Sequence, residues 1–525
     1  MAVRLTCYGG VAEIGGSKIL LEDGETRLFF DFGTSFGRQK QFFNEFLRPR
    51  AARGLLDLLA LGLIPPLEGL YRPDLTTPHL WARFRTHPHY RNLQRGEGRP
   101  AVDAVLVSHA HLDHHGDLSY LDDDIPIHSS CATALTSRAM QVTGGSTFER
   151  EIAWISLRAP GESGELKSGR EGSLHSRRFF LLEGECSAQA QAFWQTNPAS
   201  RRAWDAQPFR PSRGSIQGLA YRWWRVDHSI LGAVGFAVET SNGWIGYTGD
   251  LRFHGKYGAD SWRFAQELAA LHPLALLCEG THLHAETPLS ESQVVQNALS
   301  LIRQSAGKLV IADFAPRNIE RLSSFLELAE QSRRALVVQP KDIYTLQAIH
   351  LADPQAFPQP DSLPHLLLYA DPKAAPRPWE LELRQAWSAR TVHPTEVARS
   401  PGDFLLAWSL WDLNDLVDLE GICGGLYLYS NSKAYDEEQA TDLERLRNWV
   451  RWMGLTLHGD PDDAQSARLH ASGHASGIEL LEFVRTVRPK MLIPVHTEQP
   501  QWWQEQLLGT GILVCPPQFG KPMAL

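Results

Sequence analysis

Four residues of types that commonly bind metal ions lie within six positions of the chain. His109, His111, Asp113 and His114 directly follow Val102–Ser108, an apolar run that predicts a buried strand. Because His109 and His111 are two residues apart, their imidazoles can converge on one ion, while Asp113 and His114 face a second ion in the next turn. Imidazole and carboxylate ligands without thiolate are typical of zinc or a similar divalent metal. The motif therefore predicts a metal site at the end of a strand.

Three further candidate ligands lie far along the chain, each beside an apolar run that predicts a strand. His228 precedes such a run, whereas Asp250 and His496 each follow one directly. A single histidine at the end of a strand is more often a hydrogen-bonded polar residue than a ligand. Two ions need more ligands than residues 109–114 supply, so the three residues together with that motif predict a set of seven ligands.

The hydrophobic pattern divides the chain into two kinds of region. Short strands are predicted within residues 4–32 and again within 221–250. From about residue 285 helices alternate with strands, as in helix 290–305 and strand 308–313. This alternation is the βαβ pattern of a parallel sheet.

The spacing of the ligands indicates two domains. Asp250 and His496 must meet at one site, although 246 positions separate them (496 − 250). One or two strands cannot fill that gap, so residues 285–430 are predicted to form a domain inserted into the one that carries the ligands. A site at the interface of two domains is a usual place for a substrate cleft. Residues 38–100 and 160–215 differ in composition from their surroundings and are predicted to be insertions into the first domain.

The composition and charge of the chain limit the compartment in which the protein can work and the partners that it can bind. The 525 residues carry a formal net charge of −9, which excludes a protein that coats nucleic acid by bulk charge but allows a local basic groove. The most apolar helical stretch, Leu55–Ile64, is interrupted by Asp57 and is far shorter than the ~20 residues that a membrane span needs. The six cysteines form no CxxC pair, so neither a disulfide framework nor a cysteine zinc site is predicted. The first residues hold no apolar signal core, and we expect a cytoplasmic protein.

The ordered set of motifs resembles a known family. The HxHxDH pattern of residues 109–114 is similar to that of the metallo-β-lactamase fold, whose first, third and fourth motifs are matched by Asp31, His228 and Asp250. Three later motifs narrow the resemblance to the β-CASP group of nucleases, and within it to the ribonucleases J. They are Glu279 in Leu-Leu-Cys-Glu-Gly-Thr, His474 in His-Ala-Ser-Gly-His-Ala-Ser and His496 in Ile-Pro-Val-His.

The resemblance implies a fold of the α/β class. A metallo-β-lactamase αββα sandwich would carry an inserted β-CASP-like α/β domain. Residues 1–284 and 431–525 would form the sandwich, with the insertions near 38–100 and 160–215, and residues 285–430 would form the inserted domain.

The resemblance also implies a centre for two Zn²⁺ ions, with Mn²⁺ as the alternative metal. One ion would be held by His109, His111 and His228, the other by Asp113, His114 and His496, and Asp250 would bridge both. A hydroxide between the ions would attack a phosphodiester, since two cations lower the pKa of bound water by many units. As a ligand of the ion that activates this hydroxide, Asp113 would also be a catalytic residue.

Other residues are expected to orient the ligands or to act on the substrate. Asp31 would orient a histidine ligand, and His474, partnered by Glu279, would protonate the leaving 3′-oxygen. Phosphate contacts are expected from Ser472, the Gly473 amide, His470 and Arg317. Arginines beside aromatic residues at 83–85, 89–91, 177–180 and 223–225 fit either a groove for a single strand or solvated surfaces, and both readings stay open.

The predicted partner is single-stranded nucleic acid, RNA rather than DNA, and the predicted activity is that of a metal-dependent nuclease with no membrane partner. The alternative is a hydrolase of small esters, lactones, sulfates or phosphodiesters on the same scaffold. The acidic charge and the two insertions would suit that alternative, but it has no need of Glu279, His474 or the inserted domain. A non-catalytic binding subunit would have lost ligands, and all seven are present. The resemblance leaves a homodimer open.

Overall fold

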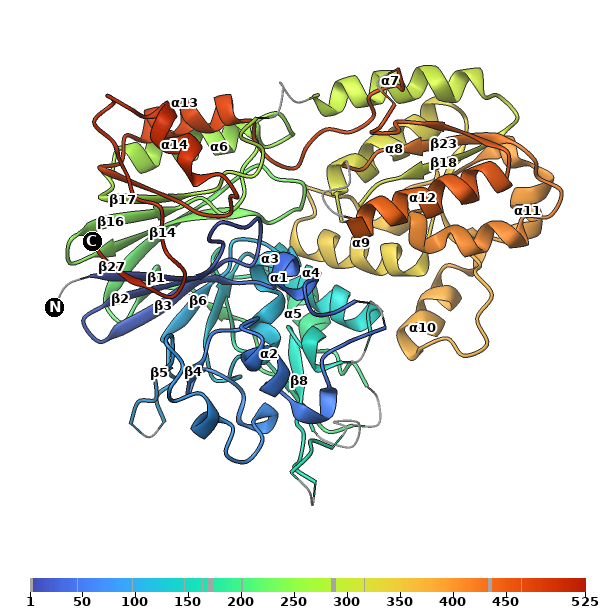
Figure 1. The fold of residues 1–525 in the computed structure, drawn as a ribbon. Coiled ribbons are helices and arrows are strands. Elements are labelled where there is room, and N and C mark those ends of the chain that lie inside the picture. Colours follow the sequence, from blue (N-terminus) through green and yellow to red (C-terminus); the bar gives the residue numbers. More distant parts are fainter. Residues whose placement is uncertain are drawn as a thin grey trace.

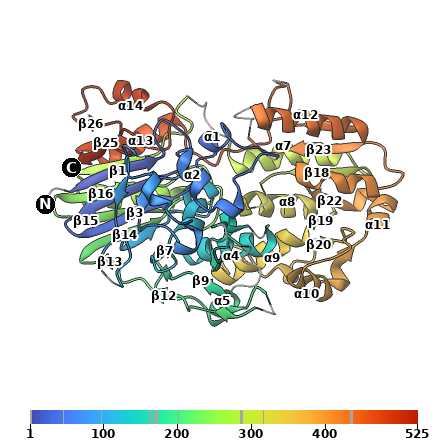
Figure 2. The ribbon, with the colours of Figure 1, turned by 60° about the horizontal axis from the view of Figure 1, so that its bottom comes forward.

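Two lobes make up the structure, and each is built on its own β-sheet framework (Figure 1, Figure 2). The structure is a computed structural model that describes residues 3–525 except 45, 97, 146, 162–163, 168–172, 200–201, 285–288, 316, 433–436 and 464. The first lobe contains both ends of the chain and is coloured mainly blue, green and red in Figure 1. The second lobe is coloured yellow and orange.

The first lobe contains two large sheets. Among the described residues, the first sheet has the strand order β12-β10-β7-β6-β3-β2-β1-β27, and the second has the order β13-β14-β15-β16-β17-β25-β26. The first sheet consists of β1 (Arg4–Gly9), β2 (Lys18–Asp23), β3 (Thr26–Phe32), β6 (Ala104–Leu106), β7 (Ile127–Ser129), β10 (Phe179–Leu181), β12 (Arg210–Pro211) and β27 (Pro522–Ala524). The second consists of β13 (Ser215–Ile216), β14 (Leu219–Arg225), β15 (Val234–Thr240), β16 (Gly243–Tyr247), β17 (Ala275–Cys278), β25 (Met491–Pro494) and β26 (Leu513–Val514).

The two sheets pack face to face through alternate side chains. In the antiparallel pair β2 and β3, Ile19 lies opposite Phe30 and Leu20 lies opposite Phe29. Successive residues of a strand point to opposite faces. Accordingly Ile19 and Phe30 are buried in the core against Phe236 of the second sheet, whereas Leu20 and Phe29 are buried in a separate core on the other face.

Helices cover both outer faces of the pair of sheets. The first sheet is covered by α2 (Leu56–Ala60), α4 (Cys131–Thr143) and α5 (Ala188–Gln195). The second is covered by α6 (Gly258–Ala269), α13 (Gly477–Val487) and α14 (Pro500–Gln506). The side chains of Ser130 and Ser476 cap the first turns of α4 and α13. The first lobe is thus an αββα sandwich, which confirms the predicted fold class.

The second lobe is a parallel sheet with helices on both faces. Among the described residues its strand order is β21-β20-β19-β22-β18-β23-β24. The strands are β18 (Leu309–Asp313), β19 (Ala335–Val338), β20 (Leu366–Tyr369), β21 (Thr391–Val392), β22 (Phe404–Ala407), β23 (Gly425–Tyr429) and β24 (Leu455–His458). One face is covered by α7 (Glu291–Gln304), α8 (Ile319–Gln331), α9 (Pro340–Ala352) and α10 (Pro378–Ala386), the other by α11 (Pro394–Arg399) and α12 (Glu437–Trp452).

The chain enters the second lobe after β17 and returns to the first before α13. The boundary expected from the sequence was residue 430, but β24 pairs with β23 and α12 packs on the same sheet. We therefore propose that the inserted unit extends from Ser290 to His458.

The segments 38–100 and 160–215 pack into the first lobe. Leu67, in β4 (Leu67–Glu68), and Leu93, just after β5 (Arg91–Asn92), are buried in the core on the outer face of the first sheet. Strand β10 from the second segment pairs with β7. The strands β8 (Trp154–Ser156), β9 (Leu174–Ser176) and β11 (Trp204–Asp205) form a further small sheet.

Candidate metal centre

The candidate ligands gather at one edge of the sandwich, where strands of both sheets end. His109 and His111 follow β6 of the first sheet and lead into the short helix α3 (Leu112–His115). Asp250 and His496 follow β16 and β25 of the second sheet, and His228 lies in the loop between β14 and β15. Packing the two sheets together is therefore what brings these residues to one place.

Three imidazoles and one carboxylate converge in the first group of donor atoms, formed by His109, His111, His228 and Asp250. Nδ1 of His111 lies 3.0 Å from Nε2 of His109 and 3.0 Å from Nε2 of His228. Oδ2 of Asp250 lies 3.6 Å from each of the same two Nε2 atoms. Burial lowers the pKa of His109 and His228 well below the ordinary value and that of His111 to about 3. All three imidazoles are therefore neutral, as metal ligands must be.

The second group, formed by Asp113, His114 and His496, lies on the other side of Asp250. Oδ1 of Asp250 is 3.2 Å from Nε2 of His114 and 3.7 Å from Nε2 of His496. Oδ2 of Asp113 is 3.2 Å from Nε2 of His496. The two oxygens of Asp250 thus face different groups, as expected of a carboxylate that bridges two ions.

The donor set fits divalent transition metals. Nε2 of His114 and Oδ1 of Asp250 are buried and have no aligned hydrogen-bond partner among the described residues. Buried polar atoms without a partner are costly, and an ion between them would satisfy both. Nitrogen and carboxylate donors without thiolate suit zinc or manganese.

Asp31 lies directly behind the second group. Its Oδ2 is 2.7 Å from Nδ1 of His114 and accepts hydrogen bonds from the hydroxyls of Ser108 (2.7 Å) and Tyr247 (2.6 Å). This contact turns Nε2 of His114 toward the other donors. Asp31 also has a positive φ of 54°, a strained conformation that is often found at functional sites. These contacts support the predicted orienting role.

A carboxylate–imidazole pair lies against the first group. Nδ1 of His474 is 3.0 Å from Oε2 of Glu279 and 3.9 Å from Oδ2 of Asp250. Burial works to lower the pKa of His474, but the carboxylates of Glu279 and Asp250 raise it to about 9. The hydroxyl of Thr281 donates to Oε2 of Glu279 (2.7 Å) and lies 3.0 Å from Nδ1 of His496. The pair is thus connected both to the bridging carboxylate and to a ligand of the second group.

Two glycines allow N-terminal loops to pack against the ligand motif. A Cβ atom at Gly33 would lie 1.8 Å from the carbonyl oxygen of Asp113, and one at Gly15 would lie 2.8 Å from Cβ of Asp113. Gly15 also has a φ of +79°, which favours glycine. Gly15 and Gly33 therefore serve the packing of the ligand loop.

Ser472 and Gly473, both predicted to contact phosphate, make protein contacts of their own. The carbonyl oxygen of Gly473 accepts a hydrogen bond from Nδ1 of His228 (2.5 Å) and so orients that ligand. The hydroxyl of Ser472 accepts from the backbone N–H of His474 (3.0 Å) and lies 2.9 Å from Nδ1 of His282. Their binding of phosphate stays a prediction.

His470 and Arg317 differ in their relation to the centre. Nδ1 of His470 lies 3.2 Å from the carbonyl oxygen of Ser430, so its imidazole contacts the second lobe just after β23. Burial lowers the pKa of Arg317, and the carboxylate of Asp113 partly opposes that shift. Arg317 thus places a cation near the ligands, where a phosphate would approach. A phosphate role for either residue stays a prediction.

A cavity of about 570 Å³, here called the central cavity, lies between the lobes beside the centre. It is lined by Leu112, which stands between two ligands, and by Phe314, Arg317, Lys341 and Trp411 of the second lobe. The four residues of the second lobe come after the strands β18, β19 and β22. Open parallel sheets commonly bind ligands at the carboxyl ends of their strands. Trp411 is 75% exposed. Cations and an accessible ring suit a single-stranded nucleic acid.

Three neighbours of the centre were not predicted from the sequence: His282, His254 and Tyr247. The ring centre of His282 is 5.4 Å from that of His474, and Nε2 of His254 is 3.0 Å from the carbonyl oxygen of Ser472. Each of the three lies within four positions of a predicted site residue. That proximity is the signal that could have identified them.

One arginine in each of two arginine–aromatic clusters makes contacts within the protein. Arg177 is fully buried and donates to the carbonyl oxygens of Leu121 (2.9 Å) and Ser119 (3.0 Å). Arg225 pairs with Oδ2 of Asp260 at 2.6 Å. The buried Arg177 is therefore not available as part of a nucleic-acid groove, whereas for Arg225, whose side chain is 43% exposed, both interpretations stay open.

Two family models match parts of the chain. The model described as the metallo-beta-lactamase superfamily matches residues 80–151, which include the His109–His114 motif. The model described as the Zn-dependent metallo-hydrolase RNA specificity domain matches residues 463–502, which include His474 and His496.

Curated relatives found by similarity are ribonucleases J. The chain is 22% identical over 512 residues to that of Corynebacterium glutamicum, and the alignment covers 94% of this chain and 54% of the relative. It is 25% identical over 291 residues to that of Mycoplasma pneumoniae, with 53% and 45% covered. The chain thus spans about half the length of the curated relatives it matches. A solved structure of a protein of unknown function from Enterococcus faecalis V583 aligns over 100% of both chains, with a TM-score of 0.66 and 20% identity, and shows the same fold.

The sandwich and the ligand motif at its edge are those of the metallo-β-lactamase fold, and the model of that superfamily matches residues 80–151. The inserted parallel sheet and the later motifs at Glu279, His474 and His496 are similar to those of the β-CASP group. Within that group the chain is similar to the ribonucleases J. The resemblance to these proteins that the sequence motifs indicated is thereby confirmed.

Proposed function

We propose that this chain is a metal-dependent nuclease that hydrolyses phosphodiester bonds of single-stranded nucleic acid, RNA in particular. The observation that carries the proposal is the position of His474, 3.0 Å from Glu279 and beside the first group of donors. A general acid beside a metal centre is what departure of a 3′-oxygen requires. His474 lies in the segment matched by the RNA specificity model, and ribonucleases J align with nearly the whole chain, which supports RNA as the substrate.

The centre would hold two zinc ions, with manganese as the alternative. His109, His111 and His228 would bind one ion, Asp113, His114 and His496 the other, and Asp250 both. When bound, the ions supply a hydroxide nucleophile near neutral pH and neutralise charge on the scissile phosphate. The opposite directions of the two Asp250 oxygens support this assignment.

The chain's own residues would orient the ligands and deliver a proton. Asp31 holds Nδ1 of His114, and the Gly473 carbonyl holds Nδ1 of His228, so that in each ring Nε2 faces the other donors. Glu279 holds Nδ1 of His474, which leaves its Nε2 to donate a proton to the leaving 3′-oxygen. A nearby Arg317 would hold a neighbouring phosphate.

Incubation of the protein with 5′-labelled single-stranded RNA and DNA of the same sequence tests the proposal. We expect RNA to be cut faster than DNA, with activity lost on chelation and restored by zinc or manganese. Release of mononucleotides or of internal fragments distinguishes the exonuclease and endonuclease modes. Turnover of a chromogenic ester without cleavage of RNA or DNA would overturn the proposal in favour of a small-molecule hydrolase.

We also propose that the protein works in the cytoplasm. All six cysteines are free thiols, which suits a reducing compartment. Within the described residues no helix has the length and apolar character to cross a membrane. A measurement of mass in solution decides whether the chain forms the homodimer that the resemblance leaves open.

A further inference from the structure

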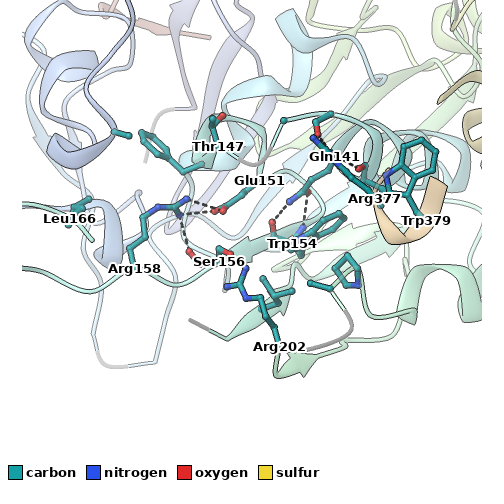
Figure 3. Close-up of a pocket in the computed structure, with 18 of the residues that line it drawn as sticks. Gln141, Thr147, Glu151, Trp154, Ser156, Arg158, Leu166, Arg202, Arg377 and Trp379 are labelled. Carbon is teal, nitrogen blue, oxygen red and sulfur yellow. Dashed lines mark hydrogen bonds and ion pairs between the residues drawn. The ribbon is translucent and has the colours of Figure 1, made fainter. Parts of the chain in front are cut away.

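The two lobes contact one another at the metal centre and also away from it. At the cavity of about 580 Å³ in Figure 3, Arg377 of the second lobe donates to the carbonyl oxygens of Val142 and Gly144 at the end of α4. The described residues that line this cavity include none of the candidate ligands. The contacts that reach the metal centre come from a different part of the second lobe, the first turn of α8.

The segment that carries His474 passes from one lobe to the other (Figure 1). Leu469 is buried in the core of the second lobe, whereas Ala475 is buried in the core between the second sheet and its helices in the first lobe. The proposed general acid therefore stands between the lobes. Its position relative to Asp250 depends on how each lobe holds this segment.

The first lobe holds the end of the segment through Leu251, the residue after the bridging ligand Asp250. The backbone N–H of Ala475 donates to the carbonyl oxygen of Leu251 (2.6 Å), and the N–H of Leu251 donates to Oε1 of Glu279 (2.5 Å). Glu279 in turn contacts His474. The backbone of Leu251 thus connects the bridging ligand with both members of the carboxylate–imidazole pair.

The second lobe holds the start of the segment through Arg321 of α8. Its guanidinium donates to the carbonyl oxygens of Leu469 (3.2 Å) and Ala471 (3.4 Å). Arg321 is fully buried, and the two carboxylate oxygens of Glu291 in α7 fix it at 2.7 and 2.9 Å. An apolar side chain could fill the same space but could not donate to carbonyl oxygens, so the guanidinium determines the path of the backbone.

The neighbouring residue of α8, Glu320, reaches the other side of the same site. Its Oε2 accepts a hydrogen bond from Nη2 of Arg252, and its Oε1 accepts one from the backbone N–H of Lys256 (2.9 Å). Arg252 is buried, and its Nε lies 3.2 Å from Oδ1 of Asp227, which directly precedes a metal ligand. Glu320 therefore anchors the loop that begins at Asp250 to the second lobe.

Both anchoring residues belong to one turn of the chain. Asn318 caps α8 with its side chain, and Glu320 and Arg321 follow in the first turn of the helix. Arg317, from which a phosphate contact is expected, comes directly before Asn318. One short stretch of the second lobe thus contacts the ligand loop and the segment of the proposed acid, and it also carries the expected phosphate contact.

We propose that Glu320 and Arg321 are positioning residues of the cleavage reaction, which set the place of His474 relative to Asp250. This inference rests on the proposed function, since it names the residues of the second lobe that direct the proton donor. The candidate metal ligands all lie in the first lobe, so the contribution of these two residues is placement. Buried ion pairs add little net stability because desolvation offsets their attraction. A displacement of about 1 Å at a catalytic group, in contrast, can lower a rate by ~10²-fold.

A double-mutant cycle tests the proposal. The side chain of Glu320 is 21% exposed, so we expect Glu320→Ala to fold. Its single-turnover cleavage rate should fall by ~10–100-fold, with metal content and RNA affinity changed by less than about twofold. In the His474→Ala background the same substitution should change the residual rate by less than about threefold, because the group that Glu320 positions is absent. Glu327→Ala, at an exposed site of the same helix, is the matched control and should alter neither rate.

A substrate with a better leaving group supplies a second measurement. In an RNA in which sulfur replaces the leaving 3′-oxygen of one bond, the thiolate that departs needs little protonation, because thiols have an ordinary pKa of ~8.5. We expect the rate defects of Glu320→Ala and His474→Ala both to shrink to less than about threefold on this substrate. Arg321→Lys keeps the charge but cannot meet Glu291 and two carbonyl oxygens together, and it should behave as Glu320→Ala does. A general loss of stability or of metal would slow the cleavage of both substrates alike.

The outcomes separate this proposal from the proposed function. Equal losses of rate from Glu320→Ala with and without His474, or equal losses on the oxygen and sulfur substrates, would overturn the positioning role and leave the nuclease standing. Unchanged rates in Glu320→Ala and Arg321→Lys would overturn it as well. Absence of cleavage of any nucleic acid by the metal-loaded wild type would overturn the nuclease itself and, with it, this inference.

Discussion

Nδ1 of His474 lies 3.0 Å from Oε2 of Glu279, although 195 positions separate the two residues in the chain. Glu279 follows β17, just before the chain leaves for the second lobe, and His474 precedes α13, just after it returns. The two side chains therefore meet at the point where the inserted unit joins the sandwich. It also places the imidazole of His474 beside Asp250, with Nδ1 at 3.9 Å from Oδ2.

Replacement of His474 should separate catalysis from metal binding. In His474→Ala we expect the metal content to stay and the cleavage rate to fall by ~10²–10⁴-fold, because a positioned general acid contributes that much. Elemental analysis and single-turnover cleavage measure the two effects, with His365→Ala in the second lobe as a control. Asp250, Glu279 and His474 also form a group of donor atoms. Loss of metal in His474→Ala would therefore make His474 a ligand, and an unchanged rate would exclude the acid role.

Asp250 should be required for both ions. We expect two transition-metal ions per wild-type chain and fewer than one in Asp250→Asn, because each carboxylate oxygen faces a different group of donors. Elemental analysis of protein purified without chelator measures this, and Asp361→Asn on the exposed surface serves as the control. A wild-type content of one ion, or an Asp250→Asn content equal to the wild type, would contradict the bridged site.

Gly33 should tolerate no side chain. In Gly33→Ala the new Cβ would lie 1.8 Å from the carbonyl oxygen of Asp113, so the ligand loop must move. We expect a loss of about 1–3 kcal/mol of stability and weaker metal binding. Thermal unfolding and metal titration measure both. Gly37→Ala is the matched control, since a Cβ there meets nothing within 4 Å, and equal behaviour of the two variants would refute the packing argument.

Arg317 should contribute to affinity without contributing to sequence preference. Each phosphate of a single strand that is neutralised contributes ~−0.7 to the slope of log affinity against log salt. In Arg317→Ala we expect weaker binding of all RNA sequences and a slope shallower by about that amount, because a phosphate contact carries no base information. Arg399→Gln, at the end of α11, should change neither quantity. A salt response that is flat in the wild type would contradict binding of a polynucleotide.

His128 should make the fold sensitive to acid. Burial lowers its pKa to about 4, and its Nδ1 lies 2.8 Å from the hydroxyl of Tyr221. The unfolded chain, with an ordinary histidine pKa of ~6.5, binds the proton more readily, so stability falls as pH drops from there toward 4, by up to about 3 kcal/mol. Thermal midpoints of wild type and His128→Gln, measured across this range, should converge at low pH. Parallel curves would show that His128 does not titrate in this way.

The local pattern of the sequence was sufficient for most elements. Helix 290–305 and strand 308–313 agree with α7 and β18 to within one residue, because an amphipathic helix and a buried strand each have a strong hydrophobic period. The motif at 109–114 likewise predicted a dense group of metal-binding side chains after a strand, because that density is rare by chance.

The local pattern did not specify how some short strands pair. Strands β9 and β10 are three residues each, too short for a period, and they lie in the stretch 160–215 that looked like an insertion. Strand β24 lies beyond the expected boundary at 430, because the choice of its partner strand is made by sheet packing and not by its own residues.

The sequence by itself determined which chemical groups are available: seven metal-binding side chains, an acid–imidazole pair and a recognisable order of motifs. Only the tertiary structure decided how they face one another. The opposite directions of the two Asp250 oxygens and the contact of His474 with Glu279 depend on distances between residues far apart in the chain. Those distances follow from the packing of whole sheets and lobes, which no local pattern encodes.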